Sequence, residues 1–290
     1  MNTHRRNQLP SHVASHYAIA PSYEPEPPRK KKGGGILSNI LLVVGLALIL
    51  VAGGMWGLAQ WRYHEQDVMN EKLASYATVS EKGDVAPKVD WEKLRAINPD
   101  VVGWIQVPGT VINYPVYQGT DNDHYLDTNA EGVYGVGGQI FLDYKCEKPG
   151  MRDQQTVIYG HHLKNGSMFK QVADMDSQGF FDSIKTVWYV TEEANYELEP
   201  LFVYYATPKS EDVRCFDFAT ADEFHEYLGK QLGKAVTKRS DAAQVCKVAD
   251  HVLTLSTCNY IDGYGRTVLV CAVKDEAAAA AGLEGASTWT

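Results

Sequence analysis

Residues 251–273 read HVLTLSTCNYIDGYGRTVLVCAV and predict two β-strands joined by a loop. The first run, Val252–Cys258, and the second, Arg266–Val273, are both rich in β-branched and apolar residues, as strands usually are. The segment between them contains Asp and Gly residues that favour turns. If the two strands pair as a hairpin, Cys258 and Arg266 lie at the same end of one sheet.

A thiol beside a guanidinium group suits nucleophilic catalysis. The cation favours the thiolate over the thiol and can stabilise an oxyanion that develops during acyl transfer. Taken alone, a Cys in a strand is more often a small core residue, and an Arg after a turn is more often solvated. Catalysis also needs a base, and residues 156–162 (TVIYGHH) offer one, because they read as a strand that runs into a Gly and two histidines.

These pieces together resemble the sortases. Residues 254–258 (TLSTC) resemble the TLxTC signature of that family. His161, directly after Gly160, resembles the catalytic histidine, and Arg266 falls where the sortase arginine follows the cysteine. Three further segments resemble class B sortases in particular, and the resemblance covers about residues 91–273. These segments are 98–126 (NPDVVGWIQVPGTVINYPVYQGTDNDHYL), 137–144 (GGQIFLDY) and 159–169 (YGHHLKNGSMF).

The resemblance implies transpeptidation by a cysteine enzyme. It makes Cys258 the nucleophile and His161 the general acid and base, while Arg266 stabilises the oxyanion or holds substrate carbonyls. His162 is the alternative base, because adjacent residues of an extended segment point in opposite directions. The family pattern, with the histidine directly after Gly, selects His161. No Asp or Asn stands out as a third group that orients the histidine.

Substrate contacts are expected close to the nucleophile. Ser256 and Thr257 directly precede Cys258 and are expected to line the substrate groove. Asn122 and Leu126, in the segment DNDHYL, match positions that resemble substrate contacts in the family. A turn Asn and a core Leu are the alternative explanation for this pair.

The hydrophobic period becomes that of strands from Val101 onward. Short β-rich runs are bounded by clusters of Gly, Pro, Asn and Asp, and eight such runs in one compact domain predict a closed barrel. The runs are 101–107, 111–117, 139–142, 156–159, 186–190, 196–206, 252–258 and 266–273. The resemblance implies the same mainly β fold, an eight-stranded sortase-type barrel with an N-terminal helix and an inserted helix, preceded by a single transmembrane helix.

Two helices are predicted in this domain. Residues 90–97 (DWEKLRAI) place an apolar residue at every third position, with Asp90 as a possible N-cap. Thr220 and Glu223 form a capping box ahead of a run with one apolar face. The second helix resembles the insertion of class B sortases before the cysteine strand.

The chain before the domain predicts a membrane anchor. Residues 36–58 carry no charge and would form a helix of about 35 Å, enough to cross a bilayer. A cleaved signal peptide would begin nearer the N-terminus, and a core helix would show a polar face. The basic residues 29–32 precede this segment, so the N-terminus is expected to stay in the cytoplasm and the catalytic domain to lie outside the cell.

The expected organisation has five parts. Residues 1–35 are a disordered basic cytoplasmic tail, 36–58 the transmembrane anchor and 59–89 a stalk or linker. Residues 90–275 are the sortase catalytic domain, and 276–290, rich in Ala and Gly, are a flexible tail.

Composition limits the partners and cofactors. The formal net charge is −9 and the basic residues gather in the tail, so the acidic globular part argues against nucleic-acid binding. The five cysteines have no metal-ligand spacing, and no calcium-binding loop pattern is present, so neither a metal nor another cofactor is expected.

The leading hypothesis is a membrane-anchored class B sortase of a Gram-positive bacterium. Such an enzyme cleaves the C-terminal sorting signal of a surface protein and joins the acyl fragment to an amine of a peptidoglycan precursor or a pilin. Two alternatives stay open: a catalytically idle surface-binding or scaffold protein on a sortase barrel, and a cysteine peptidase that only hydrolyses.

Overall fold

The structure, a computed structural model, describes residues 35–207, 211–259, 261 and 265–276. Almost all of the expected N-terminal tail and the C-terminal tail beyond residue 276 lie outside the described residues. The chain divides into two compact units, residues 1–53 and 54–290. Helix α1 (Ile36–Ala74) begins in the first unit and ends in the second, and its length and composition would allow it to cross a membrane.

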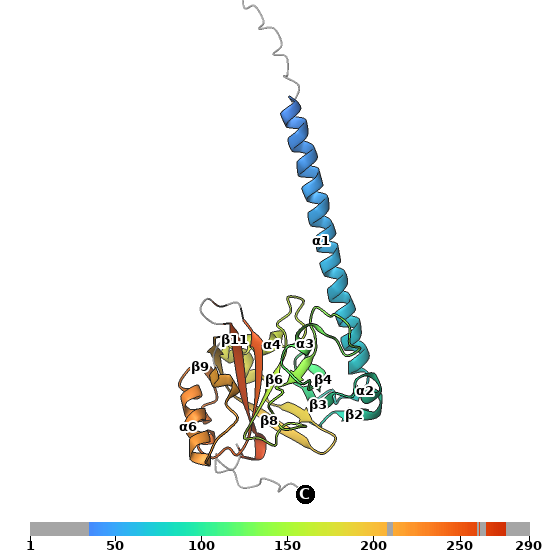
Figure 1. Cartoon of the computed structure of the whole chain (residues 1–290). Coiled ribbons are helices and arrows are strands. Elements are labelled where there is room, and N and C mark those ends of the chain that lie inside the picture. The colour runs from blue at the N-terminus through green and yellow to red at the C-terminus, as the bar shows by residue number, and fades with distance from the viewer. Residues whose placement is uncertain (1–34, 208–210, 260, 262–264, 277–290) are drawn as a thin grey trace, which may run out of the picture. The chain divides into compact units, whose positions relative to one another are not determined.

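Eight strands of the second unit close into a barrel (Figure 1). They pair in the order β11-β10-β6-β5-β4-β3-β7-β8, and β8 pairs in turn with β11. The fold class predicted from the sequence is therefore confirmed, and each strand matches one of the predicted runs to within two residues. The strands are β3 (Val101–Gln106), β4 (Asn113–Tyr117), β5 (Ile140–Leu142), β6 (Gln155–Tyr159), β7 (Val187–Val190), β8 (Asn195–Ala206), β10 (Val252–Cys258) and β11 (Arg266–Val273).

Side chains of each strand alternate between the barrel interior and its outer surface. Leu253 and Leu255 of β10 pack inside, against Leu269 of β11. Val252 and Val268 point outward into a second apolar cluster, which helix α6 (Ala221–Leu232) helps to cover. Each of these buried aliphatic side chains contributes about 1.5–3 kcal/mol of transfer free energy, so both faces of the hairpin are strongly specified.

This alternation also sets the register that positions the site. A shift by one residue would exchange the inward and outward faces of a strand, so the apolar pattern holds the pairing in place. In that register Cys258 lies opposite Arg266 on β11, and Ser256 lies opposite Tyr159 on β6. The Gly160 N–H continues the ladder, donating to the Ser256 carbonyl at 3.2 Å.

Both predicted helices of the domain are present. In α2 (Trp91–Ile97), the Asp90 carboxylate accepts from the Lys93 N–H at 3.1 Å, as an N-cap should. In α6 the Thr220 hydroxyl accepts from the Glu223 N–H at 3.2 Å. Glu223 completes the cap one residue early, because it accepts from the Ala219 N–H instead of that of Thr220.

Several smaller elements complete the fold. They are β1 (Ala77–Thr78), β2 (Lys88–Val89), α3 (His124–Asp127), α4 (Lys170–Asp174), α5 (Gln178–Ser183), the 3₁₀ helix η1 (Glu211–Arg214), β9 (Ala235–Lys238) and α7 (Ala242–Val245). Strand β9 was not predicted. It is short and pairs with residues 202–204 of β8, beyond residues 195–198, with which β7 pairs.

The segment expected to be a linker is structured. Helix α1 continues to Ala74, and Gln66, Asn70 and Leu73 on its last turns are buried against the domain. Strands β1 and β2 then pair as a hairpin. Its polar composition led to the expectation of a stalk or linker, and within it Gln66 and Asn70 are polar residues that hydrogen-bond inside the domain.

Candidate active site

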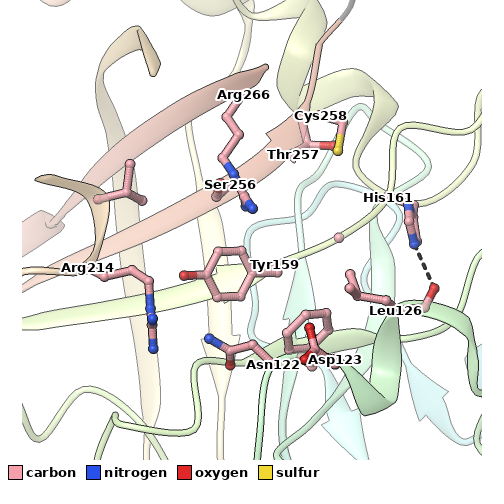
Figure 2. A pocket seen from close by; sticks show the side chains of 13 residues that line it. Asn122, Asp123, Leu126, Tyr159, His161, Arg214, Ser256, Thr257, Cys258 and Arg266 are labelled. Atoms are coloured by element: carbon pink, nitrogen blue, oxygen red, sulfur yellow. Dashed lines mark hydrogen bonds between the residues drawn. The ribbon is translucent and has the colours of Figure 1, made fainter. Parts of the chain in front are cut away.

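A pocket of about 270 Å³ lies at the end of β10 and collects the predicted nucleophile, base, cation and substrate contacts (Figure 2). Strand β10 supplies three of them, and the others come from the loop after β4, helix α3 (His124–Asp127), the segment after β6 and the start of β11. The lining residues are Asn122, Asp123, Leu126, Phe141, Tyr159, Gly160, His161, Val213, Arg214, Ser256, Thr257, Cys258 and Arg266.

Cys258 and Arg266 face the pocket from paired strands. Cys258 is the last residue of β10 and is exposed, whereas the rest of that strand is buried. Arg266 begins β11, and its Cζ lies 5.5 Å from the centre of the Tyr159 ring. A guanidinium over an aromatic face gains a cation–π attraction. The ring therefore holds the cation at the mouth of the pocket, in the neighbourhood of the thiol.

His161 is oriented by a backbone group. Its Nε2 lies 2.7 Å from the Leu126 carbonyl oxygen, in Figure 2 on the side of the ring that faces away from Cys258. A carbonyl oxygen can only accept, so Nε2 carries the proton of this hydrogen bond. In the neutral ring Nδ1 is then the basic nitrogen. The orienting group that sequence reasoning could not identify is this carbonyl.

The surroundings of residue 160 explain why a glycine precedes the histidine. A Cβ at Gly160 would come within 2.5 Å of Ile140 Cδ1 and 2.6 Å of Phe169 Cγ, so the backbone passes too close to the core for a side chain. His162 has a different position from His161. It does not line the pocket, and its Nδ1 lies 3.0 Å from the carbonyl oxygen of Cys258, to which it donates.

A buried carboxylate, Asp143, supports the floor of the pocket. Its Oδ2 accepts from Arg214 Nε at 2.7 Å, from the Tyr159 hydroxyl at 2.8 Å and from Asn122 Nδ2 at 2.9 Å. Burial alone raises the pKa of the Asp143 carboxyl, but the hydrogen bonds from Arg214, the Lys145 N–H and the other donors outweigh it and hold the pKa below its usual value.

Sequence reasoning missed Asp143, Arg214 and Tyr159. Asp143 directly follows the buried strand IFL, and Tyr159 directly precedes Gly160 and His161. Their positions at the ends of strands next to recognised motifs could have indicated that both lie near the site. Arg214 gave none, because it is 71 residues from Asp143, at the end of a short 3₁₀ helix that the sequence did not predict.

The four expected substrate contacts occupy different settings. The Ser256 and Thr257 hydroxyl oxygens are buried and have no hydrogen-bond partner among the described residues. Leu126 is 41% exposed, so it is not the core residue that was the alternative explanation. Asn122 is held by Asp143 and accepts from the Tyr144 N–H at 3.1 Å.

The described residues contain no group of three or more His, Cys, Asp or Glu side chains that could hold a metal ion. All five cysteines are free thiols. Burial raises the pKa of both Cys146 and Cys246 to about 12, and it raises that of Cys271 further. Cys258 is the exposed one among them.

Comparison with known proteins agrees with this geometry. A family model described as "Sortase domain" matches residues 105–275. Sortase B of Staphylococcus aureus is 34% identical over 231 residues, covering 79% of this chain and 90% of the relative. Sortase B of Listeria monocytogenes is 32% identical, covering 80% of this chain and 95% of the relative.

Solved structures extend the comparison to the fold. A crystal structure of sortase B from B. anthracis, in complex with AAEK1, has a TM-score of 0.62 at 30% identity and covers 73% of this chain and 98% of its own. A Staphylococcus aureus sortase B–substrate complex has a TM-score of 0.56 at 31% identity and covers 63% and 83%. The chain therefore belongs to the sortase family, and within it to class B, whose members are cysteine transpeptidases.

Proposed function

We propose that this protein is anchored in the membrane with its catalytic domain outside the cell, cleaves a sorting signal in surface proteins and joins the acyl fragment to a cell-wall or pilin amine. The observation that carries the proposal is one pocket lined by a nucleophile, a base and a cation: Cys258, His161 and Arg266. The same arrangement gives each of these residues a role.

Acylation uses all three groups. The Cys258 sulfur attacks the scissile carbonyl carbon as the thiolate, and the carbonyl oxygen takes up the negative charge. The Arg266 guanidinium stabilises that oxyanion. As the C–N bond breaks, the leaving amine takes a proton from Nδ1 of the His161 imidazolium, whose Nε2–H stays bonded to the Leu126 carbonyl. The product is a thioester on Cys258.

Deacylation runs the same steps in reverse with a new amine. The incoming amine attacks the thioester carbonyl and gives its proton to His161 Nδ1, and the thiolate leaves. A thioester splits one difficult exchange of amides into two easier steps. Water in place of the amine would give a free acid, the product expected of a hydrolytic peptidase.

The pocket wall supports recognition of a peptide. Ser256 and Thr257 line the pocket directly before the nucleophile Cys258. Asn122 and Leu126 line the pocket on the side away from Ser256 and Thr257 (Figure 2). Among similar structures, one Staphylococcus aureus sortase B is bound to substrate and another sortase B is complexed with triglycine, which supports a sorting signal and an amine as the two partners.

Helix α1 supports the membrane part of the proposal. Its first half has no charged residue, and the basic residues 29–32 precede it, which favours a cytoplasmic N-terminus. Protease added to intact cells without their wall is then expected to digest the domain and to spare the tail. Protection of the domain would contradict this topology.

Product analysis tests the reaction. The full chain is incubated with a library of sorting peptides and with triglycine or a Lys-containing peptide as acceptor, and the products are read by mass spectrometry. Amine-captured peptide supports the proposal, free acid alone indicates a hydrolase, and absence of cleavage indicates a scaffold. Cys258→Ala is the control that must abolish both the thioester and the product.

A further inference from the structure

The last turns of helix α1 contain a buried polar face. Gln66 is 3% exposed and Asn70 is 8% exposed, and Gln66 Nε2 donates to Asn70 Oδ1 at 3.1 Å. Both belong to the unit that contains the barrel. Buried amides are costly unless they are hydrogen-bonded, so the partners of these two side chains indicate what this face is for.

Gln66 binds the segment that supports the carbonyl partner of His161. Gln66 Oε1 accepts from the Gly137 N–H at 3.1 Å, and Gln66 Nε2 lies 3.4 Å from the Gly138 carbonyl oxygen. Gly138 has a positive φ of 50°, and a side chain there would collide with the carbonyl oxygens of Tyr125 and Leu126. The segment that Gln66 holds therefore lies directly against the Leu126 carbonyl that accepts the hydrogen bond from His161 Nε2–H.

Asn70 and its neighbour Asp67 bind the loop that carries His161 itself. Asn70 Nδ2 lies 3.7 Å from Met168 Sδ, and Asp67 accepts from Asn165 Nδ2 at 2.9 Å. The same loop closes on the base, because the Phe169 N–H donates to the His161 carbonyl at 2.8 Å. One face of α1 thus contacts both the segment against the Leu126 carbonyl and the loop that carries His161. The relative position of these two segments fixes the orientation of the His161 ring.

We propose that Gln66 and Asn70 are positioning residues for His161. The helix that carries the apolar N-terminal segment would then be a structural part of the catalytic unit as well as an anchor. Neither residue touches the pocket, so their effect is indirect: they hold the Leu126 carbonyl and the His161 loop in register. The proposal rests on the acid and base role of His161 in the proposed function.

The test uses the full chain in detergent micelles or lipid vesicles. Gln66→Leu and Asn70→Leu replace each amide with an apolar side chain of comparable volume and remove its hydrogen bonds, while Gln60→Leu, at an exposed position of the same helix, is the matched control. We expect kcat for acylation to fall at least tenfold in the first two variants, with KM changed less than twofold and the control unaffected, because small displacements of a catalytic group are costly.

A second readout is independent of the substrate. The pH dependence of Cys258 alkylation by iodoacetamide reports how the thiol ionises beside His161, and we expect the Gln66→Leu profile to shift relative to the wild type and to Gln60→Leu. This readout also separates two failures: a wild type that transfers nothing contradicts the proposed function, while the alkylation profiles still test the positioning.

The exposed hydrogen-bonded pair Asp67 and Asn165 provides a second test if a variant of a buried residue does not fold. Asn165→Ala removes the bond to Asp67 at the surface, and we expect a two- to threefold fall in kcat with the melting temperature unchanged. If Gln66→Leu folds, a wild-type kcat together with an unchanged alkylation profile would overturn the proposal. If Gln66→Leu does not fold, a wild-type kcat in Asn165→Ala would overturn it.

Discussion

The Leu126 carbonyl decides which nitrogen of His161 can serve as the base. Because that oxygen accepts from Nε2, the proton moves through Nδ1 in both half-reactions. Two adjacent histidines in the sequence gave no such information. A backbone carbonyl has no signature in a sequence, so this part of the site could only come from the three-dimensional structure.

The histidine pair gives the first prediction. His161→Ala should lower transfer by about 10²–10⁴-fold, the usual contribution of a general acid and base. His162→Ala should retain most of the activity, because the His162 ring lies outside the pocket and its Nδ1 bonds to the backbone of Cys258. Turnover with an added amine measures both variants. The reverse ranking would mean that His162 is the base.

Arg266→Lys gives the second prediction. Lysine keeps the charge but loses the planar fork of donors and its stacking on Tyr159. Loss of one oxyanion donor lowers catalysis by about a hundred- to a thousandfold, and we expect acylation to fall by that factor. Mass spectrometry of enzyme trapped with substrate measures acylation, and alkylation of Cys258 serves as the control for an intact thiol. Near wild-type transfer would make the arginine structural.

Among the elements, the 3₁₀ helix η1 is tied to the barrel by one carboxylate. Asp143, after β5, holds Arg214 of η1 together with Tyr159 of β6 and Asn122 of the loop after β4. The Asp143 side chain is completely buried, and that of Arg214 is 36% exposed. The relative positions of four segments around the pocket therefore depend on the Asp143 carboxylate.

Asp143→Asn gives the third prediction, on stability and pH. Removing one partner of a buried ion pair costs about 3–5 kcal/mol, and we expect about 3 kcal/mol here because Arg214 is partly hydrated. The folded-state pKa of Asp143 is lowered, so its contribution to stability is present above the unfolded pKa of about 3.9 and is lost as the pH falls through the folded value.

The measurement is the free energy of unfolding by urea between pH 6 and pH 2.5. The wild type should lose stability below about pH 4, and Asp143→Asn should lose less over that window, since Asn does not titrate. Asn122→Ala removes a neighbouring donor without removing the charge and serves as the control. Equal pH slopes in wild type and Asp143→Asn would exclude this role for the carboxylate.

The elements were more predictable than their connections. All eight barrel strands follow from runs of β-branched residues between turn signals, and the helix starts follow from Asp90 and Thr220. Strand β9 and the end of α1 did not follow, because their burial comes from partners far away in the chain. Local pattern reports propensity, whereas these segments are decided by tertiary contacts.

At the scale of the whole molecule, closure of the barrel assembles the site. Motifs near residues 122, 161, 258 and 266 could be recognised separately, and the fold brings them to one pocket. The residues that support the site could not be recognised in this way. Asp143 with Arg214 and Gln66 with Gly137 are pairs widely separated in sequence, and neither member has a pattern that points to the other.

The two halves of the pocket differ in how firmly the backbone is held. Cys258 and Arg266 end strands that hydrogen-bond to two neighbours each, while His161 lies just beyond the end of β6. Amide hydrogens of such ladders exchange only when the whole domain opens, whereas loops open locally at lower free energy. We expect amides of Leu253 and Leu255 to exchange most slowly, and those of residues 161–168 much faster.

A difference in thermal behaviour follows from this contrast. Warming should loosen the base before it disturbs the nucleophile, so transfer should decline several degrees below the unfolding midpoint and return on cooling. Parallel curves of activity, Cys258 alkylation and circular dichroism against temperature would measure the separation. Coincident loss of all three would mean that the pocket and the barrel melt as one cooperative unit.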